Sequence, residues 1–257
     1  GYLTIINNVG YPNPNRSHFR STDIWQTASS ANEYLDTGWL GRYIDRYGKM
    51  TYSGIEIDDS LSLIMKGETM NGIATKNPRI LFDNTQTPYF KKVLSHQSDK
   101  HLSEHNLGYL YKTMIEAKSS AKYIYETSKT YKSKQEYPNN EFGKQLKTTA
   151  EFINSNIKTK VFYVSMGGFD THANQANRQK RLLSTFSESM GVFVNELKEN
   201  DTFKDTLILT FSEFGRRVQQ NAAGGTDHGA ANNVFIIGEN LKSKGFYNEL
   251  PDLANLD

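Results

Sequence analysis

The chain has 257 residues, 37% of them hydrophobic, and a formal net charge of +2 at pH 7. Nucleic-acid-binding domains are typically strongly basic, with clustered Lys and Arg, so this mild charge predicts no nucleic-acid partner. The sequence has no cysteine, which excludes disulfides, thiolate metal ligands and cysteine nucleophiles. No apolar run approaches the roughly 20 residues of a transmembrane helix, so we expect no membrane-spanning segment.

The first third of the chain alternates between strand patterns and helical patterns. Strand candidates, recognised as short apolar or alternating runs, lie at residues 3–7, 53–67 and 78–82. Helical spacing of apolar residues runs from residue 17 or 21 to residue 31, and again from 38 to 48. The chain opens on strand and turn patterns and closes on a polar stretch, so we expect a piece of a longer protein.

Residues 101–158 are mostly helical in pattern. One helix face is marked by apolar residues three and four apart, namely Phe142, Leu146, Ala150, Ile153 and Ile157. The lysine-rich stretch before them is interpreted as a solvated face followed by a turn, with a basic binding helix as the alternative. His101 and His105 share a face if they are helical, but no Glu follows the first His as in zinc-protease helices. We therefore interpret these two and His96 as surface histidines.

The last hundred residues predict a parallel sheet. Three apolar runs indicate buried strands, at residues 161–166, 206–211 and 233–238. Between the first two, residues 178–198 form an amphipathic helix pattern with an apolar stripe from Leu182 to Leu197. Continuous apolar strands that alternate with a helix are typical of a parallel sheet covered on both faces. We therefore expect an α/β fold with a mostly parallel sheet, in a single domain over residues 1–257.

Polar clusters follow these strands where ligands bind in open α/β sheets, beyond the carboxyl ends of the strands. The stretches GGFDTHANQ and SEFGRR follow the first two strands, and GGTDHGAAN leads into the third. The topology therefore predicts one edge that carries Asp170, His172, Glu213, Arg216, Asp227 and His228. Carboxylate and imidazole are the ligands that Zn, Mn and Fe prefer. Because strand side chains alternate, Asp170 and His172 point the same way.

Each of these residues also has a purely structural interpretation. Asp170 and Asp227 can cap turns, while Asp227 can instead be a metal ligand or the acceptor that orients an imidazole. Glu213 can be a carboxylate at a helix start. Arg216 can bind a phosphate or sulfate oxygen, or can neutralise Glu213. A separation of more than about 8 Å between His172 and His228 would favour this structural interpretation over any metal site, because one ion could not reach both.

Five motifs in order carry a family resemblance: YPNPNRSHFRSTDIWQTA, TGWLGRYID, GGFDTHANQ, LTFSEFGRR and GGTDHGAANNVFIIG. From Val9 to about Leu253 the chain resembles the bacterial family called domain of unknown function 1501. That family is similar to the alkaline phosphatase and sulfatase superfamily. The resemblance implies a three-layer α/β/α sandwich, a divalent metal such as Zn or Mn, and hydrolysis of phosphate or sulfate esters.

The resemblance also assigns roles to residues. Asp170 and His172 match the superfamily's first pair of metal ligands, and His228 matches its later histidine. Glu213 stands for the Asp of a second metal, but Phe214 replaces the accompanying His, so the second metal lacks an expected ligand. The superfamily's first strand, which ends in a metal-binding Asp, precedes this chain, so we expect a fragment that lacks that strand and the C-terminal end.

The stretch NPNRSHFRST supplies the candidate nucleophile. Ser17 stands at a predicted helix start, where it is either the nucleophile that the resemblance implies or only the N-cap. His18 is then a proton donor or an anion contact, and Arg16 or Arg20 an oxyanion contact. The expected substrate is a small-molecule ester. The alternative is a non-catalytic protein on the same scaffold that binds a carbohydrate or acts in a surface complex. By resemblance we expect a periplasmic or extracellular location, with the cytoplasm as the alternative.

Overall fold

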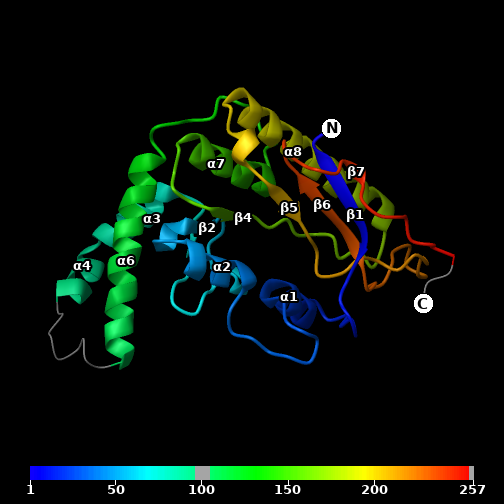
Figure 1. Cartoon of the computed structure of the whole chain (residues 1–257), viewed down its shortest axis with the longest axis horizontal. Helices are drawn as coiled ribbons and strands as arrows, with labels where there is room; N and C mark the ends of the chain where they lie inside the picture. The colour runs from blue at the N-terminus through cyan, green and yellow to red at the C-terminus, as the bar shows by residue number, and fades with distance from the viewer. Residues whose placement is uncertain (96–104, 255–257) are drawn as a thin grey trace. The chain divides into compact units, whose positions relative to one another are not determined.

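The computed structural model describes residues 1–95 and 105–254 (Figure 1). His96 and His101 lie outside the described residues, and so does the side chain of His105. The chain divides into two compact units, which are described separately. The first unit comprises residues 1–36, 135–143 and 166–257, and the second comprises residues 37–134 and 144–165. The expectation of one domain stays a prediction.

The first unit is built on a four-stranded sheet of order β5-β6-β1-β7. Its strands are β1 (Leu3–Val9), β5 (Ile208–Thr210), β6 (Asn232–Ile237) and β7 (Gly245–Phe246). Strand β6 runs antiparallel to both β1 and β5, and only the short β7 pairs in parallel with β1. The unit also contains helix α1 (His18–Thr27), helix α8 (Gln175–Glu199) and the 3-10 turn η3 (Phe203–Asp205).

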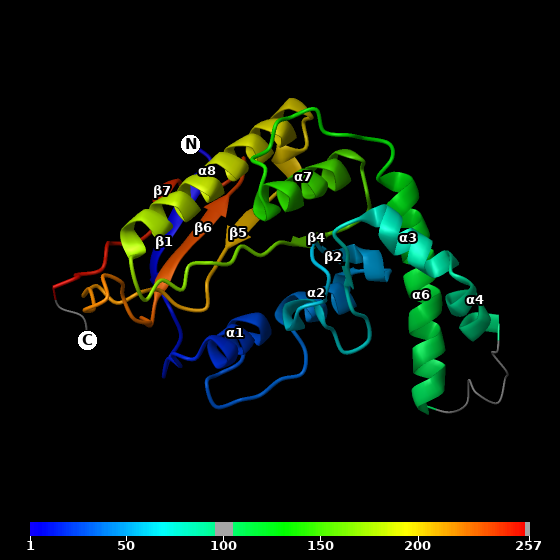
Figure 2. The same ribbon diagram turned by 180° about the vertical axis from the view of Figure 1, so that it is seen from behind.

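Helix α8 covers one face of this sheet (Figure 1 and Figure 2). Its buried side includes Met190, Phe193 and Leu197, as the spacing of the apolar residues predicts. Leu183 belongs to the same predicted stripe but is exposed. Phe186 faces the sheet, with its ring centroid 6.5 Å from that of Phe235 on β6. The amphipathic pattern therefore predicts the element and most of its packed side correctly.

The second unit contains a three-stranded parallel sheet of order β3-β2-β4. The strands are β2 (Gly54–Glu56), β3 (Ile73–Ala74) and β4 (Val161–Tyr163). The helices are α2 (Trp39–Tyr47), α3 (Pro78–Gln86), α4 (Pro88–Ser95), α6 (His105–Thr127) and α7 (Glu141–Asn154), with 3-10 turns η1 (Thr51–Ser53) and η2 (Leu63–Met65). Helix α7 begins within residues 135–143 of the first unit.

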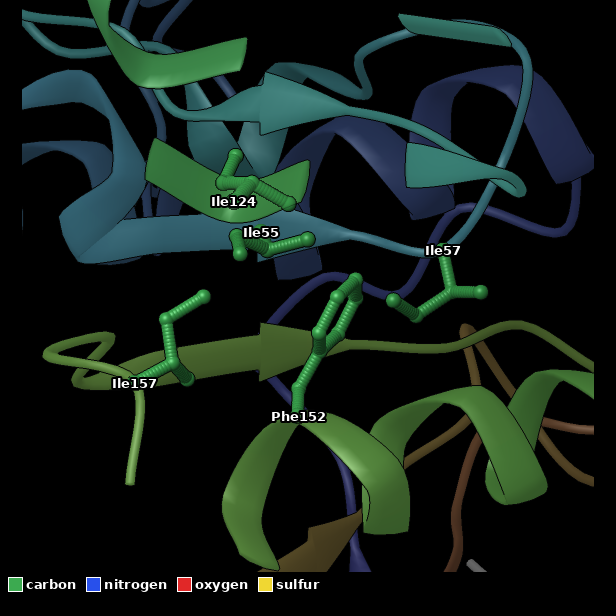
Figure 3. Close-up of a cluster of buried hydrophobic side chains, with 5 residues drawn as sticks. All are labelled: Ile55, Ile57, Ile124, Phe152 and Ile157. Carbon is green, nitrogen blue, oxygen red and sulfur yellow. The ribbon is translucent and has the colours of Figure 1, made fainter. Parts of the chain in front are cut away.

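The core of the second unit joins its sheet to two helices (Figure 3). Ile55 and Ile57, two residues apart and therefore on one side of the chain, pack with Ile124 of α6, Phe152 of α7 and Ile157. All five side chains are buried. Burying an Ile or Phe side chain stabilises a fold by about 1.5–3 kcal/mol, so this cluster is a major source of the unit's stability.

The fold is mixed α/β with a parallel sheet. Residues 53–67 form a strand only over Gly54–Glu56, with the 3-10 turn η2 at Leu63–Met65, and two further sequence expectations are wrong. Residues 161–166, 206–211 and 233–238 do not form one parallel sheet: β4 belongs to the second unit, and β5 pairs antiparallel with β6. The physical reason is the connection from β5 to β6, which folds back through an antiparallel bridge between Arg216 and His228. A parallel pair needs a crossover, usually a helix, and residues 211–231 form none.

The second correction concerns residues 78–82, which are helix α3 and not a strand. Asn77 caps this helix, because its side chain accepts hydrogen bonds from the backbone amides of Arg79 and Ile80. Pro78 at the first helical position adds a preset backbone angle. Asn77 followed by Pro78 indicates a helix start, although the apolar run after them resembles a strand. None of the helices within residues 1–95 and 105–254 is both long and apolar enough to cross a membrane.

Candidate metal centre

Four segments of the first unit bring the candidate site residues together. They are residues 16–18 at the start of α1, 170–172 before α8, 213–216 after β5, and 226–228 before β6. The local backbone needs unusual conformations here: Gly168 has φ +100°, and Asn174, the cap of α8, has φ +48°. Both lie in the left-handed region that glycine and asparagine tolerate best. The turn they form carries Asp170 and His172.

Asp170 is the centre of the cluster. Its Oδ1 lies 2.9 Å from Nε2 of His172 and 3.1 Å from Nε2 of His228, and it accepts a 2.8 Å hydrogen bond from Nη1 of Arg216. Its Oδ2 lies 3.3 Å from Nε2 of His18. Although burial raises the pKa of Asp170, the contacts with His228 and Arg216 and the positive charge that His172 and His18 carry when protonated lower it to about 2. Asp170 is therefore a carboxylate at neutral pH.

In His172 and His228, the hydrogen bond that Nδ1 makes determines whether Nε2 is free to bind a cation. Nδ1 of His228 donates to the backbone carbonyl of Arg16 at 2.7 Å, and Nδ1 of His172 donates to Oδ1 of Asp227 at 3.2 Å. Both acceptors lack a proton, so each neutral imidazole carries its hydrogen on Nδ1. The two Nε2 atoms, 2.9 Å apart, therefore turn lone pairs toward one another. Lone pairs that converge in this way repel unless a cation or a proton lies between them.

His18 adds a third imidazole to the cluster. Its Nδ1 donates to Oε1 of Glu213 at 2.8 Å, and Oε2 of Glu213 accepts from the hydroxyl of Ser212 at 2.9 Å. Nε2 of His18 is buried and makes no hydrogen bond within the described part of the chain. His18, Asp170 and His228 offer ligand atoms that all lie within 4.8 Å of one another.

Arg216 ties the cluster to the loop that carries His228. Besides Asp170, its guanidinium donates to the hydroxyl of Thr226, through Nε at 3.2 Å, and to the carbonyl of Thr226. The side chain is only 16% exposed. The backbone bridge between Arg216 and His228 places the two residues side by side. Arg216 therefore binds Asp170. Its proximity to Glu213 in the sequence suggests Glu213 as the partner instead.

Asn221 and Gly225 shape the loop behind His172. The amide of Asn221 donates to the carbonyl of His172 at 3.0 Å and to Asp227 at 3.3 Å. Hydrogen bonds from Asn221 and His172 hold the pKa of Asp227 below its usual value. A Cβ atom at Gly225 would lie 2.2 Å from the carbonyl carbon of His172, so only glycine permits this approach.

The aromatic ring of Phe214 supports two of the imidazoles. Its centroid lies 4.5 Å from that of His228, in a stacked arrangement, and 4.9 Å from that of His18. Phe214 is 6% exposed. Phe214 is thus a packing residue at the side of the cluster.

The structure brings together every predicted site residue of the three polar clusters, and His18 with them. His172 and His228 are in contact, so the separation of more than about 8 Å that would favour purely structural histidines is not found. Asp227 contacts His172, and Glu213 contacts His18. Ser17 is exposed and occupies the N-cap position of α1, as the N-cap interpretation predicts, but its side chain makes no capping hydrogen bond.

Three features of the site were not predicted from the sequence. The side chains of Asn221 and Thr226 organise the loop, and the carbonyl of Arg16 is a backbone group that no side-chain pattern reveals. Asn and Thr inside a Gly-rich stretch are a signal for such loop hydrogen bonds. Arg20 is not an oxyanion contact, because it donates to the carbonyls of Ala31 and Glu33 and lies over the ring of Tyr34.

The donor set fits a divalent cation. Atoms about 3 Å apart can all lie about 2.1 Å from one ion, and the set contains one carboxylate oxygen and two or three imidazole nitrogens. Each imidazole is oriented by an acceptor at its outer nitrogen, as is usual for metal-binding histidines. Zn and Mn both accept such ligands.

Comparison with known proteins yields one family. The chain matches the family described as Protein of unknown function (DUF1501) over residues 3–255. No curated protein and no solved structure matches. The matched span includes all four segments of the candidate metal centre. The chain therefore belongs to the DUF1501 family.

Proposed function

We propose that this protein is a divalent-metal-dependent hydrolase of phosphate or sulfate esters. The observation that carries the proposal is the convergence of the Asp170 carboxylate with the Nε2 lone pairs of His172 and His228. The motif likeness to the alkaline phosphatase and sulfatase superfamily supports it, and a three-layer α/β/α sandwich is part of the same proposal. Asp170, His172 and His228 would hold the ion, which when bound supplies a Lewis acid that polarises an ester oxygen.

The residues of the chain have distinct tasks in this proposal. Ser17 is exposed beside His18 at the start of α1, where free backbone amides favour an anion, and its hydroxyl is the candidate nucleophile. Arg216 keeps Asp170 in place through its hydrogen bond. Asp227 holds Nδ1 of His172 protonated, so that Nε2 remains free to bind the ion. Glu213 performs the same task for His18.

The test has two steps, both on the purified full chain. Metal content after incubation with Zn²⁺ or Mn²⁺ and removal of free ion is compared between the wild type, Asp170→Asn and the matched control Asp205→Asn. Asp205 is exposed in η3, so its replacement by Asn makes the same chemical change away from the cluster. We expect a bound ion in the wild type and the control but not in Asp170→Asn. An equal, negligible content in all three proteins would refute the metal centre.

Hydrolysis of an aryl phosphate and an aryl sulfate is then measured for the metal-loaded wild type, Ser17→Ala and His172→Ala. We expect turnover of at least one ester by the wild type, and its loss in both variants. Bound metal without turnover of either ester would favour the alternative function, a non-catalytic protein that binds a carbohydrate or a partner on the same scaffold. The replacement of a second-metal histidine by Phe214 is the observation that motivates this alternative.

A further inference from the structure

We infer that His18 is a direct ligand of the same ion, through Nε2, and so links the start of α1 to the metal. The inference rests on the proposed metal centre and extends it to a residue that the sequence suggested only as a proton donor or anion contact. The inference adds a fourth ligand to the same ion and does not propose a second ion. Asp170, His172, His228 and His18 then form a set of four protein ligands.

The first argument is the state of the two ring nitrogens of His18. Nδ1 is occupied, because it donates to Glu213 at 2.8 Å. Glu213 is a strong acceptor and is itself held by the hydroxyl of Ser212. The neutral ring therefore carries its proton on Nδ1 and its lone pair on Nε2. A carboxylate that orients an imidazole in this way is the usual outer partner of a metal-binding histidine.

The second argument is the surroundings of Nε2. This atom is buried, and it makes no hydrogen bond to any residue that the structure describes. Leaving a buried acceptor unsatisfied costs about 1–3 kcal/mol, so such an atom calls for a partner. Oδ2 of Asp170 lies 3.3 Å from this atom, and as a carboxylate oxygen it offers a neutral imidazole no hydrogen. A cation satisfies both atoms.

The third argument is position. The ligand atoms of His18, Asp170 and His228 all lie within 4.8 Å of one another. Bonds of about 2.1 Å to one ion span at most about 4.2 Å, and the 3.3 Å between Nε2 of His18 and Oδ2 of Asp170 is within that reach. The rings of His18 and His228 meet edge to face, with centroids 4.4 Å apart, and Phe214 packs against both. His18 is therefore held against the cluster by packing as well as by Glu213.

The test counts the histidine ligands directly. In Co²⁺-loaded protein, the Nδ1 hydrogens of bound imidazoles give exchangeable proton resonances that the metal shifts far from the normal range. We expect three such resonances in the wild type, from His18, His172 and His228, and two in His18→Asn. The matched control is Phe19→Asn, which introduces the same residue at the adjacent, 87% exposed position and should keep three. Circular dichroism verifies that the variants are folded.

Zn²⁺ affinity provides an independent readout. Residues that only orient a ligand typically contribute 10–100-fold to metal affinity. We expect Glu213→Gln to weaken binding within that range and His18→Asn to weaken it by more than about 100-fold. Two shifted resonances in the wild type would overturn the assignment of His18, and this result does not require a folded variant. Absence of bound metal in the wild type would instead remove the proposed metal centre, and the inference with it.

Discussion

The ring of Phe214 stacks on the imidazole of His228, with centroids 4.5 Å apart and an interplanar angle of 29°. The aromatic ring thus keeps the imidazole of His228 in place by packing. In the metal centre proposed above, the position of this ligand is then set by packing as much as by hydrogen bonds.

Phe214→Leu should destabilise the protein and weaken metal binding together. Leucine keeps an apolar side chain but loses the aromatic contacts with His228 and His18, which are worth about 0.5–1.5 kcal/mol each. We expect the free energy of unfolding in urea to fall by about 1–3 kcal/mol. Zn²⁺ affinity measured by calorimetry should fall as well, because two imidazoles lose their support. Unchanged affinity would show that the ring only fills space.

Asp227→Ala should lower Zn²⁺ affinity by about 10–100-fold, because Nδ1 of His172 loses the acceptor that fixes its proton. Asp227→Asn keeps an oxygen at the same position and should lose much less. Calorimetric titration of both variants at pH 7 makes the comparison. Equal effects of the two substitutions would show that the charge of Asp227 matters and that its hydrogen bond does not.

Gly225→Ala should disrupt the loop behind His172, because the new methyl group would meet the His172 carbonyl carbon at 2.2 Å. Overpacking of this kind typically costs 1–3 kcal/mol, and a clash with backbone places the change at about the upper end. Gly167→Ala is the matched control, since a Cβ there has no neighbour within 4 Å. Thermal unfolding of both variants, without added metal, should show a lower midpoint only for Gly225→Ala.

Arg216→Lys should destabilise the protein, although both side chains carry a positive charge. A lysine cannot reproduce the hydrogen bonds that the guanidinium makes to Asp170 and to both oxygens of Thr226. We expect a loss of about 1–3 kcal/mol in the free energy of unfolding, measured in the presence of a chelator so that bound metal makes no contribution. Arg217→Lys, one position along, is the control, and an equal loss there would contradict the assignment.

The fifth prediction concerns pH and the second unit. Glu56 is 2% exposed on β2 and accepts hydrogen bonds from the amide and hydroxyl of Ser62. Burial raises its pKa, with a smaller contribution from Asp58, against the lowering effect of Ser62. A folded-state pKa above the unfolded one means that stability is greatest below the unfolded pKa, near 4.5, and falls as pH rises through the folded value.

Glu56→Gln removes this titration. The free energy of unfolding of the variant relative to the wild type should therefore increase as pH rises from 4 to 8, in a series of urea titrations at separate pH values. Glu136→Gln, at an exposed position, is the control. A difference that stays constant or decreases with pH would contradict the raised pKa of Glu56.

Local patterns predict most elements of this fold, but not their pairing. Apolar spacing correctly indicates β1, α1, α2, α8 and β6, because these elements bury one side against a core. The spacing does not predict whether neighbouring strands run parallel or antiparallel, since an apolar run looks the same in either kind of pair. The return of the chain from β5 to β6 depends on a bridge between Arg216 and His228, which no spacing rule contains.

The predicted site residues lie together in the structure, although the premises of the prediction were partly wrong. Parallel strand ends were expected to bring Asp170 and His228 together. Instead, Arg216 joins their two loops, and Asn221 secures the backbone behind His172. His18 could not be assigned from sequence, because a single His at a helix start has no spacing relation to ligands about 150 residues further along the chain. Only the folded geometry reveals that its free nitrogen faces Asp170.

The hydrogen bond between His228 and the carbonyl of Arg16 spans 212 residues of sequence. At a synthesis rate of about 5–20 residues per second, the start of α1 exists for roughly 10–40 s before His228 is made. During that interval its segment has neither the β6 strand that pairs with β1 nor the imidazole that meets Arg16. An ion held by all four segments, as proposed above, could therefore bind only after residue 228 has been added to the growing chain, so metal loading would follow the synthesis of the last of these segments.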